Sequence, residues 1–508
     1  MARDFFCTAG GPVVQTAYGP VRGYALDGIF TFRGIRYAKA RRFRMPESPD
    51  PWSTPDNCFS FKYECPVMSP QGFDTELFVP RFRTLPNEQC HYLNIWTPSL
   101  VSGSAKAVMV WLHGGAFSTG SGHAHLAMDG AALSRTGDVV VVTLNHRLNW
   151  LGFLDVSSLG GEYGNSVNAG MEDIVFALRW IRDNIAAFGG NPDNVTLFGQ
   201  SGGGEKIQAL LQIPEAKGLF RRGIIQSGAY GLHRSSPEER ADELCRLLKI
   251  LDIPANRPQL LEEAPYAAVT AAIASMITDP FELWMHFCPQ KNSWYLGDIR
   301  QEGLSPSGRN VDILLGSLFA EFNGPRPFEP SGREDGWPEV RAKLLEKCGG
   351  DPFRADRLIR LFREAYPSKA PCALFWLDDM FRRPTLDLAG ILAVESRAKV
   401  YTYLMDYTLP VDGGYPARHS TDIPFVFHNA SLVPACNFGA ASDRLEREIS
   451  SAWAAFAKSG NPVCGLLPAW SPYTPESPAV MVFTNEKTEC RPNPDAELAR
   501  EWYALSHP

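Results

Sequence analysis

Short apolar segments rich in β-branched residues alternate with helical patterns along most of this chain. Segments of this kind, apolar on both faces, are typical of strands inside a parallel sheet that helices cover on both sides. The clearest are residues 107–113, 138–145 and 195–199, followed by residues 223–226, 311–316 and 400–405. The alternation predicts an α/β fold with a mostly parallel central sheet.

Helical patterns lie between these segments. One apolar stripe has steps of three and four residues and ends at Gly189-Gly190, which predicts a helix. Its members are Ile174, Leu178, Ile181, Ile185 and Phe188. Further helices are predicted directly after Ser201, directly before Val400 and over residues 445–458.

Two parts of the chain depart from this alternation. Alternating segments at residues 14–24, 29–37 and 92–96 predict antiparallel strands at the start of the sheet. Residues 237–306 are helical in pattern and interrupted by proline, which predicts a cap-like insertion near the site. The sequence contains no internal repeat and no low-complexity linker, so we expect a single domain over residues 1–508.

Composition narrows the range of functions. The 508 residues carry a formal net charge of −7 and no long Lys/Arg cluster, which argues against nucleic-acid binding. The first residues form no continuous apolar stretch, and no run approaches the ~18 to 20 apolar residues of a membrane span. We therefore expect a soluble, cytoplasmic protein, whose oligomeric state the sequence leaves open. The 11 cysteines have no metal-ligand spacing, so no zinc or iron–sulfur site is indicated. We also expect that the protein needs no metal and no cofactor.

Gly199-Gln200-Ser201-Gly202-Gly203 is a G-x-S-x-G element. An apolar strand runs into it and a helical pattern runs out of it, which is the context of a nucleophilic serine on a tight turn. The glycines are needed because side chains beside such a turn would clash. Ser201 would lie at the positive end of a helix, where the Gly202 amide faces the oxyanion formed when Ser201 attacks a carbonyl.

A second glycine pair, Gly114-Gly115, directly follows the predicted strand that ends at His113. Adjacent glycines after a strand permit a turn whose amides point inward, so both are candidates for further oxyanion donors. The alternative interpretation is an ordinary turn. The downstream G-x-S-x-G element favours the oxyanion role.

These motifs belong to a wider resemblance. The chain resembles the type-B carboxylesterases, the family that includes bacterial para-nitrobenzyl esterases and, more distantly, cholinesterases. The matching stretches cover nearly the whole chain and are residues 90–96 (CHYLNIW), 113–117 (HGGAF), 145–148 (NHRL), 177–204 (ALRWIRDNIAAFGGNPDNVTLFGQSGGG), 226–228 (QSG) and 459–462 (SGNP). The resemblance implies the α/β-hydrolase fold and ester hydrolysis by a serine triad.

The family orders its triad serine, acid, histidine, and this chain offers candidates in that order. His419 lies in residues 417–425 (ARHSTDIPF), which resemble the family's histidine loop and follow the predicted strand at 400–405. As a base it would accept the proton of Ser201 and pass it to the leaving group. The other histidines that we weighed are interpreted as packed or surface residues (His91, His146, His286) or as a pair without further metal ligands (His123, His125).

Glu321 is the candidate for the acid. It follows the predicted strand at 311–316, as the family acid does, and its two neighbouring phenylalanines favour a buried carboxylate. In that role it would accept a hydrogen bond from His419 and stabilise the imidazolium. The alternatives are an ordinary surface glutamate at this position, or Asp312 or Glu302 as the acid, although both rivals lie on the wrong side of the strand end.

Several residues depart from the family pattern. Gln200 precedes the nucleophile where the family usually has Glu, which removes a negative charge and weakens any preference for cationic substrates. Gly202 stands in place of the usual Ala. Glu205 and Lys206 occupy early helix positions that are normally small and uncharged, and the sequence gives no physical account of them.

Cys65 and Cys90 resemble the pair that forms a disulfide in secreted members of the family. In a reducing cytoplasm they would remain thiols, and the sequence leaves the conflict open.

The predicted reaction is acyl transfer to water through an acyl-enzyme on Ser201. The partner is a small-molecule ester, neutral and mostly apolar, and the aromatic candidates for the pocket wall are Phe117, Trp96 and Phe425. A lipase, thioesterase or amidase would use the same triad, so the sequence does not separate these activities. A non-catalytic binding protein is the remaining alternative, which the full set of triad residue types disfavours.

Overall fold

The computed structural model of the chain describes residues 4–68, 79–232, 235–254, 256–257, 259–324 and 335–507. Its strands are β1 (Phe5–Phe6), β2 (Val13–Gln15), β3 (Pro20–Arg22), β4 (Tyr24–Leu26), β5 (Ile29–Arg36), β6 (Asp56–Asn57), β7 (Tyr92–Thr97), β8 (Lys106–Leu112), β9 (Val140–Leu144), β10 (Gly190–Gln200), β11 (Arg222–Gln226), β12 (Asp312–Leu318), β13 (Val400–Met405), β14 (Thr408–Leu409), β15 (Tyr415–Pro416), β16 (Ala479–Phe483) and β17 (Thr488–Pro492).

Within the described residues, twelve of these strands form one sheet with the order β1-β4-β5-β7-β9-β8-β10-β11-β12-β13-β16-β17. Every pairing from β9 through β8 to β16 is parallel. The pairings of β1, β4, β5 and β7 at one edge, and of β17 at the other, are antiparallel. The predicted mostly parallel sheet with an antiparallel start is therefore confirmed.

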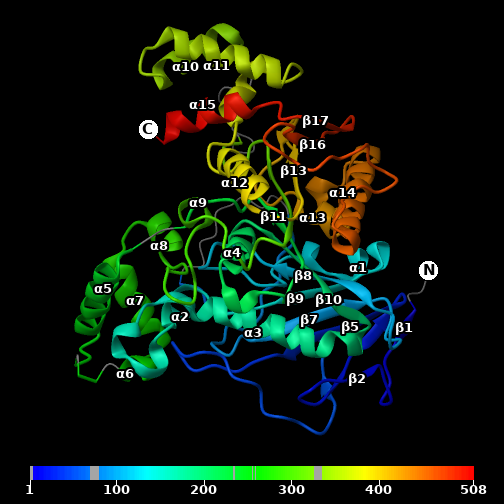
Figure 1. Cartoon of the computed structure of the whole chain (residues 1–508), viewed down its shortest axis with the longest axis vertical. Helices are drawn as coiled ribbons and strands as arrows, with labels where there is room; N and C mark the ends of the chain where they lie inside the picture. The colour runs from blue at the N-terminus through cyan, green and yellow to red at the C-terminus, as the bar shows by residue number, and fades with distance from the viewer. Residues whose placement is uncertain are drawn as a thin grey trace.

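The helices follow the strands along the chain and surround the sheet (Figure 1). They are α1 (Ala131–Gly137), α2 (Asn149–Phe153), α3 (Ala169–Asn184), α4 (Gly202–Leu211), α5 (Pro237–Ile250), α6 (Leu260–Glu263), α7 (Tyr266–Met276), α8 (Pro280–His286), α9 (Ile299–Glu302), α10 (Trp337–Lys347), α11 (Pro352–Ala365), α12 (Arg382–Glu395), α13 (Ile423–Val426), α14 (Ala440–Ser459) and α15 (Ala496–Ser506). The predicted helices after Ser201, before Val400 and over residues 445–458 correspond to α4, α12 and α14.

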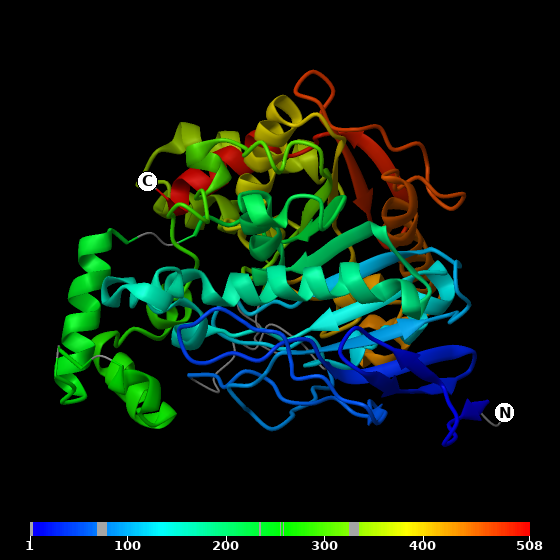
Figure 2. The same cartoon turned by 60° about the horizontal axis from the view of Figure 1, so that its bottom comes forward.

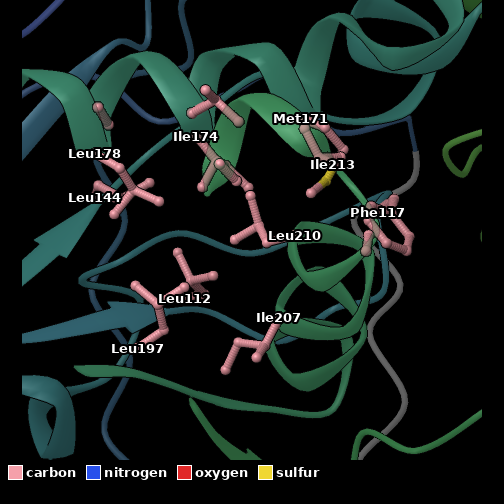
Figure 3. Close-up of a cluster of buried hydrophobic side chains, with 14 of the residues drawn as sticks. Leu112, Phe117, Leu144, Met171, Ile174, Leu178, Leu197, Ile207, Leu210 and Ile213 are labelled. Atoms are coloured by element: carbon pink, nitrogen blue, oxygen red, sulfur yellow. The ribbon is translucent and has the colours of Figure 1, made fainter. Parts of the chain in front are cut away.

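The two faces of the sheet carry separate hydrophobic cores. Val108, Val110 and Leu112 of β8 belong to the cluster that α3 and α4 help to build. The residues between them belong to the cluster that includes α1 and α14. Figure 2 shows α3 running across one face of the sheet, and Figure 3 shows Leu112 grouped with side chains of α3 and α4. Because successive side chains of a strand point to opposite faces, a strand covered on both sides is apolar throughout, as predicted.

The structure corrects the expectation for residues 14–24. They do not form one strand of the main sheet: β2 and β3 join β6 in a separate three-stranded sheet, and only β4 enters the large one. The chain bends at Gly23, where it passes so close to β5 that a Cβ would lie 2.3 Å from the carbonyl oxygen of Thr31. The edge strands β16 and β17 are an addition that the sequence patterns did not indicate.

Residues 237–306 contain helices α5 to α9 and, among the described residues, no strand. They lie between β11 and β12, two strands that pair directly with one another. Helices α5, α6 and α7 gather at one side of the molecule, at the lower left of Figure 1. The segment is therefore part of the helical crossover that connects two neighbouring parallel strands.

The ends of β8 and β10 meet the first turn of α4 at backbone contact distance. A Cβ on Gly203 would lie 1.9 Å from the carbonyl oxygen of Leu112, and one on Gly199 would lie 2.6 Å from the carbonyl carbon of Gly203. Neither neighbour is a flexible side chain, so only glycine permits this approach. The contact fixes where α4 begins relative to the sheet.

Gly203→Ala should therefore destabilise the protein by about 1 to 3 kcal/mol, because the backbone of β8 or α4 must move. Gly390→Ala is the matched control: Gly390 also lies within a helix, and a Cβ there would meet nothing within 4 Å. That substitution should instead stabilise by about 0.5 to 1 kcal/mol. Urea unfolding followed by tryptophan fluorescence measures both. Equal stabilities for the two variants would contradict the packing account.

Candidate active site

Ser201 lies between β10 and α4 in a backbone conformation that residues other than glycine rarely adopt. Its φ and ψ angles are 56° and −126°. Its backbone N–H donates to the carbonyl oxygen of Gln226, with 2.7 Å between nitrogen and oxygen. The G-x-S-x-G element thus forms the strand–turn–helix that its context predicts. Strained non-glycine residues of this kind collect at functional sites.

Glu321 and His419 form a buried hydrogen-bonded pair. His419 Nδ1 lies 2.6 Å from Glu321 Oε2. Glu321 is 0% exposed and His419 is 4% exposed. The loop after β12 carries Glu321 and the loop after β15 carries His419, and the two loops are joined by a backbone hydrogen bond from the N–H of His419 to the carbonyl oxygen of Glu321. The prediction of a buried carboxylate at this position is confirmed.

The other carboxylate oxygen of Glu321 accepts two further hydrogen bonds. Ser227 Oγ donates to Oε1 at 2.6 Å, and a backbone N–H at the end of β12 donates at 2.7 Å. Together with the imidazole, these donors satisfy the buried charge and fix its orientation. The rival acids lie elsewhere, since Asp312 begins β12 and Glu302 ends α9.

The ring of His419 contacts two phenylalanine rings, which also contact each other. The ring centroid of Phe322 lies 4.3 Å away and that of Phe381 lies 4.9 Å away, with interplanar angles of 30° and 20°. These aromatic contacts restrict the orientation of the imidazole. Its Nε2 lies 3.1 Å from Nε2 of Gln200, the residue before Ser201. With Nδ1–H donated to Glu321, Nε2 carries the lone pair that accepts this bond.

One pocket opens onto these groups. Ser201, His419, Gly114 and Gly115 all line it, so the structure brings together the predicted nucleophile, the predicted base and the Gly114-Gly115 pair. Its apolar wall consists of Val67, Phe82, Met128, Trp284, Phe322 and Ile423, and its charged lining residues are Glu64, Arg81 and Arg83. No sequence motif marks the loop around residue 82 or the position of Trp284 in α8, so neither residue could be predicted to line the pocket.

The three aromatic residues predicted to form the pocket wall are corrected by the structure. Trp96, Phe117 and Phe425 are not among the described residues that line this pocket, and each is at most 1% exposed. Phe117 belongs to the hydrophobic cluster drawn in Figure 3. Trp96 and Phe425 belong to the cluster on the opposite face of the sheet. Aromatic character alone did not indicate the side of the backbone on which each ring lies.

Two more carboxyl groups are buried close to Glu321. Burial raises the pKa of Asp422 to about 6, and the charge of Glu321 adds to this, while a hydrogen bond from Gln226 opposes it. Burial and the charge of Glu321 also hold the pKa of Asp378 well above its usual range. Several carboxylates in one water-excluded region cannot all ionise without a cost in free energy.

The described residues contain no group of three or more histidine, cysteine or acidic side chains that could hold a metal ion. His91 and His146 are buried, as predicted, and His286 Nε2 lies 2.8 Å from Glu243 Oε1. Cys65 and Cys90 are buried free thiols in this structure.

Comparison with known proteins decides the family. Residues 10–342 and 366–502 match the model of the carboxylesterase family. The chain belongs to this family. It is 33% identical to the para-nitrobenzyl esterase of Bacillus subtilis (strain 168) over 494 residues, which cover 94% of this chain and 95% of the relative. It is 31% identical to the phenmedipham hydrolase of Pseudarthrobacter oxydans over 499 residues, which cover 94% and 96% of the two chains.

A solved structure of an esterase from anaerobic Clostridium hathewayi, described as able to hydrolyse aliphatic aromatic polyesters, is also similar. It has a TM-score of 0.92 and 38% identity, with 99% of this chain and 100% of that chain covered. The fold is the α/β-hydrolase fold and the chain is a carboxylic ester hydrolase, as the resemblance implied. Among the described residues, none of the helices has the length and apolar character required to cross a membrane.

The raised pKa of Asp422 has a consequence for this carboxylesterase that can be measured. The group favours its protonated form in the folded chain, so its stabilising contribution is present below the usual pKa of 3.8 and is lost as pH rises through about 6. Asp422→Asn stays neutral and can still accept the hydrogen bond from Gln226. Its free energy of unfolding should therefore rise relative to wild type by about 3 kcal/mol between pH 3.5 and pH 7.5. Urea titrations at both pH values measure this, and a difference independent of pH would contradict it.

Proposed function

We propose that Ser201, His419 and Glu321 are the catalytic triad of this ester hydrolase. The observation that carries the proposal is the 2.6 Å hydrogen bond between His419 Nδ1 and Glu321 Oε2, placed where His419 and Ser201 line the same pocket. An imidazole whose Nδ1–H is held by a carboxylate presents the Nε2 lone pair, which is the form that can accept a proton.

Hydrolysis then proceeds by two acyl transfers. His419 Nε2 takes the proton from Ser201 Oγ as the oxygen attacks the ester carbonyl, and it returns that proton to the departing alkoxide. A water molecule next attacks the acyl-enzyme with the same proton movements, which releases the acid and restores Ser201. Glu321 keeps the imidazole oriented and stabilises its charged form. The contact between Gln200 and His419 Nε2 must give way to the Ser201 hydroxyl during this cycle.

The backbone amides of Gly114, Gly115 and Gly202 are the proposed oxyanion donors. Gly114 and Gly115 line the pocket with Ser201, and Gly202 is the first residue of α4. The positive end of that helix adds to the stabilisation of negative charge near Ser201. Donors of this kind act on charge that develops only in the transition state.

The substrates that we propose are neutral esters with apolar or aromatic groups. Phe82, Trp284 and Phe322 provide aromatic surface in the pocket that contains Ser201. The similar proteins include a para-nitrobenzyl esterase and an esterase that hydrolyses aliphatic aromatic polyesters, which supports aromatic esters as a substrate class. Residues 237–306 would act as a cap-like part of a single domain over 1–508, because Trp284 of α8 reaches the pocket and its carbonyl oxygen accepts a hydrogen bond from Ser118.

Ser201→Ala and His419→Ala should each reduce kcat for p-nitrophenyl butyrate by about 10⁴-fold or more. Glu321→Gln should lower kcat by about 10⁴-fold, because an amide cannot stabilise the imidazolium. Asp312→Asn is the matched control, since it replaces the rival carboxylate at the other end of β12 and should leave activity near that of wild type. Steady-state kinetics measure all four variants.

Labelling by a fluorophosphonate probe gives an independent check on the nucleophile. Wild type should be labelled on Ser201 with one equivalent, and Ser201→Ala should not react. An unlabelled wild-type protein would favour the non-catalytic alternative. If a folded Ser201→Ala variant kept its activity, the proposed triad would be wrong.

A substrate panel separates the activities that share a triad. We expect kcat/KM to be higher for aryl esters of neutral acids than for the matching anilide or thioester, and higher for neutral than for cationic alcohol groups, because Gln200 carries no charge beside Ser201. Turnover of the anilide at a rate equal to that of the ester would instead identify an amidase.

A further inference from the structure

Two charged residues, Glu205 and Lys206, are buried in the first turns of α4 next to Ser201. Lys206 is 0% exposed and Glu205 is 4% exposed. Charged side chains are seldom buried in this way unless they make specific hydrogen bonds. The triad and the proposed oxyanion donors do not include either of them.

Lys206 reaches from α4 to the loop that follows β8. Its Nζ donates to the carbonyl oxygen of Ala116 at 2.7 Å and to that of His113 at 3.0 Å. The same ammonium lies 5.3 Å from the centroid of the Phe117 ring. One side chain therefore holds two peptide groups of residues 113–117, the loop that carries Gly114 and Gly115.

These two bonds constrain the neighbouring amides. In a trans peptide the C=O of one residue and the N–H of the next point in opposite directions. With the carbonyl of His113 turned toward Lys206, the N–H of Gly114 is turned away from it. Gly114 lines the pocket, and a Cβ on it would lie 3.4 Å from Cβ of Ser201. Lys206 thus sets the direction of an amide directly beside the nucleophile.

The loop that follows β8 also packs closely against the first residue of α4. A Cβ on Gly202 would lie 2.3 Å from the carbonyl oxygen of Ala116 and 2.5 Å from its Cα. The alanine that usual family members carry at this position has no room here. Ala116 itself adopts a φ of 50°, a value that non-glycine residues hold only when their surroundings require it. Two residues therefore accompany the close approach of the loop to α4: Lys206 donates hydrogen bonds to the loop, and Gly202 has no side chain that would collide with it.

The two hydrogen bonds do not depend on a particular protonation state. Burial lowers the pKa of Lys206 to about 7, and the charge of Glu205 opposes this. The imidazoles of His113 and His146 also face Lys206, and their own pKa values are lowered by burial and by its charge. An ammonium offers three N–H donors and a neutral amine offers two, so either form can serve both carbonyl groups.

We propose that Lys206 is a positioning residue that orients the peptide between His113 and Gly114, so that the Gly114 amide is pre-aligned for the oxyanion on the Ser201 adduct. The inference rests on the proposed roles of Ser201 and Gly114. It predicts that Lys206 contributes to transition-state binding and not to the binding of the ester itself.

Lys206→Met tests this, because methionine has a similar length without a donor. We expect kcat for p-nitrophenyl butyrate to fall about 10- to 100-fold with KM within twofold of wild type. The affinity for a trifluoromethyl ketone, whose Ser201 adduct carries an oxyanion, should fall by the same factor as kcat/KM. Lys206→Arg retains N–H donors and should recover part of kcat.

Glu205→Gln is the matched control, since it removes a neighbouring buried charge without touching the loop, and its kcat should stay within about threefold of wild type. End-point titration with a fluorophosphonate counts the folded sites in each variant, and kcat is calculated per titrated site. An unchanged kcat and ketone affinity in a fully titrated Lys206→Met variant would overturn the proposal, as would an equal loss in Glu205→Gln. If Lys206→Met does not titrate, Lys206→Arg decides. A loss of kcat with an equal loss of ketone affinity and an unchanged KM supports the role, and a loss of kcat without a loss of ketone affinity overturns it. Failure of wild type itself to be labelled would refute the triad, a result distinct from all of these.

Discussion

Backbone contact without intervening side chains around Ser201 is the constraint on which the rest of the site depends. Ser201 has a positive φ, and the next two residues pack closely on other backbone: Gly203 lies against the carbonyl of Leu112 and Gly202 lies against Ala116. These contacts fix three things at once: the start of α4, the direction of the serine side chain and the position of the loop after β8. A side chain inserted at either glycine would move all three together, because packed backbone has no flexible part that can yield.

Burial of charge is the second principle of the site. Three hydrogen-bond donors, including the imidazole that Glu321 orients, reduce the free-energy cost of burying this carboxylate. Asp378 also accepts backbone hydrogen bonds and Asp422 accepts one from Gln226, but burial and the charge of Glu321 still raise the pKa values of both groups. A water-excluded setting strengthens these interactions and makes the surrounding acids sensitive to pH.

The parts of the fold that local chemistry dictates could be predicted from the sequence. Continuous β-branched runs indicated the parallel strands, and the glycines around Ser201 indicated the turn. The acid and base came from the order of a family triad and not from local pattern. The pocket wall was not predictable, because Phe82 and Trp284 reach it from segments far apart in the sequence. Trp96 was misplaced because a strand residue belongs to one face or the other, and composition does not tell which.

The departures of this chain from its family become intelligible when they are considered as a set. A lysine inside α4 is costly alone, because its charge is removed from water and needs partners. Carbonyl groups of the loop after β8 provide those partners only if the loop lies close, and the loop can lie close only where residue 202 has no side chain. Without Lys206, the carbonyl groups of His113 and Ala116 would lose the side-chain donor that they share, and a side chain at residue 202 would displace Ala116 from Lys206. The lysine at position 206 and the glycine at position 202 therefore explain each other. Neither residue can be explained from its own position in the sequence.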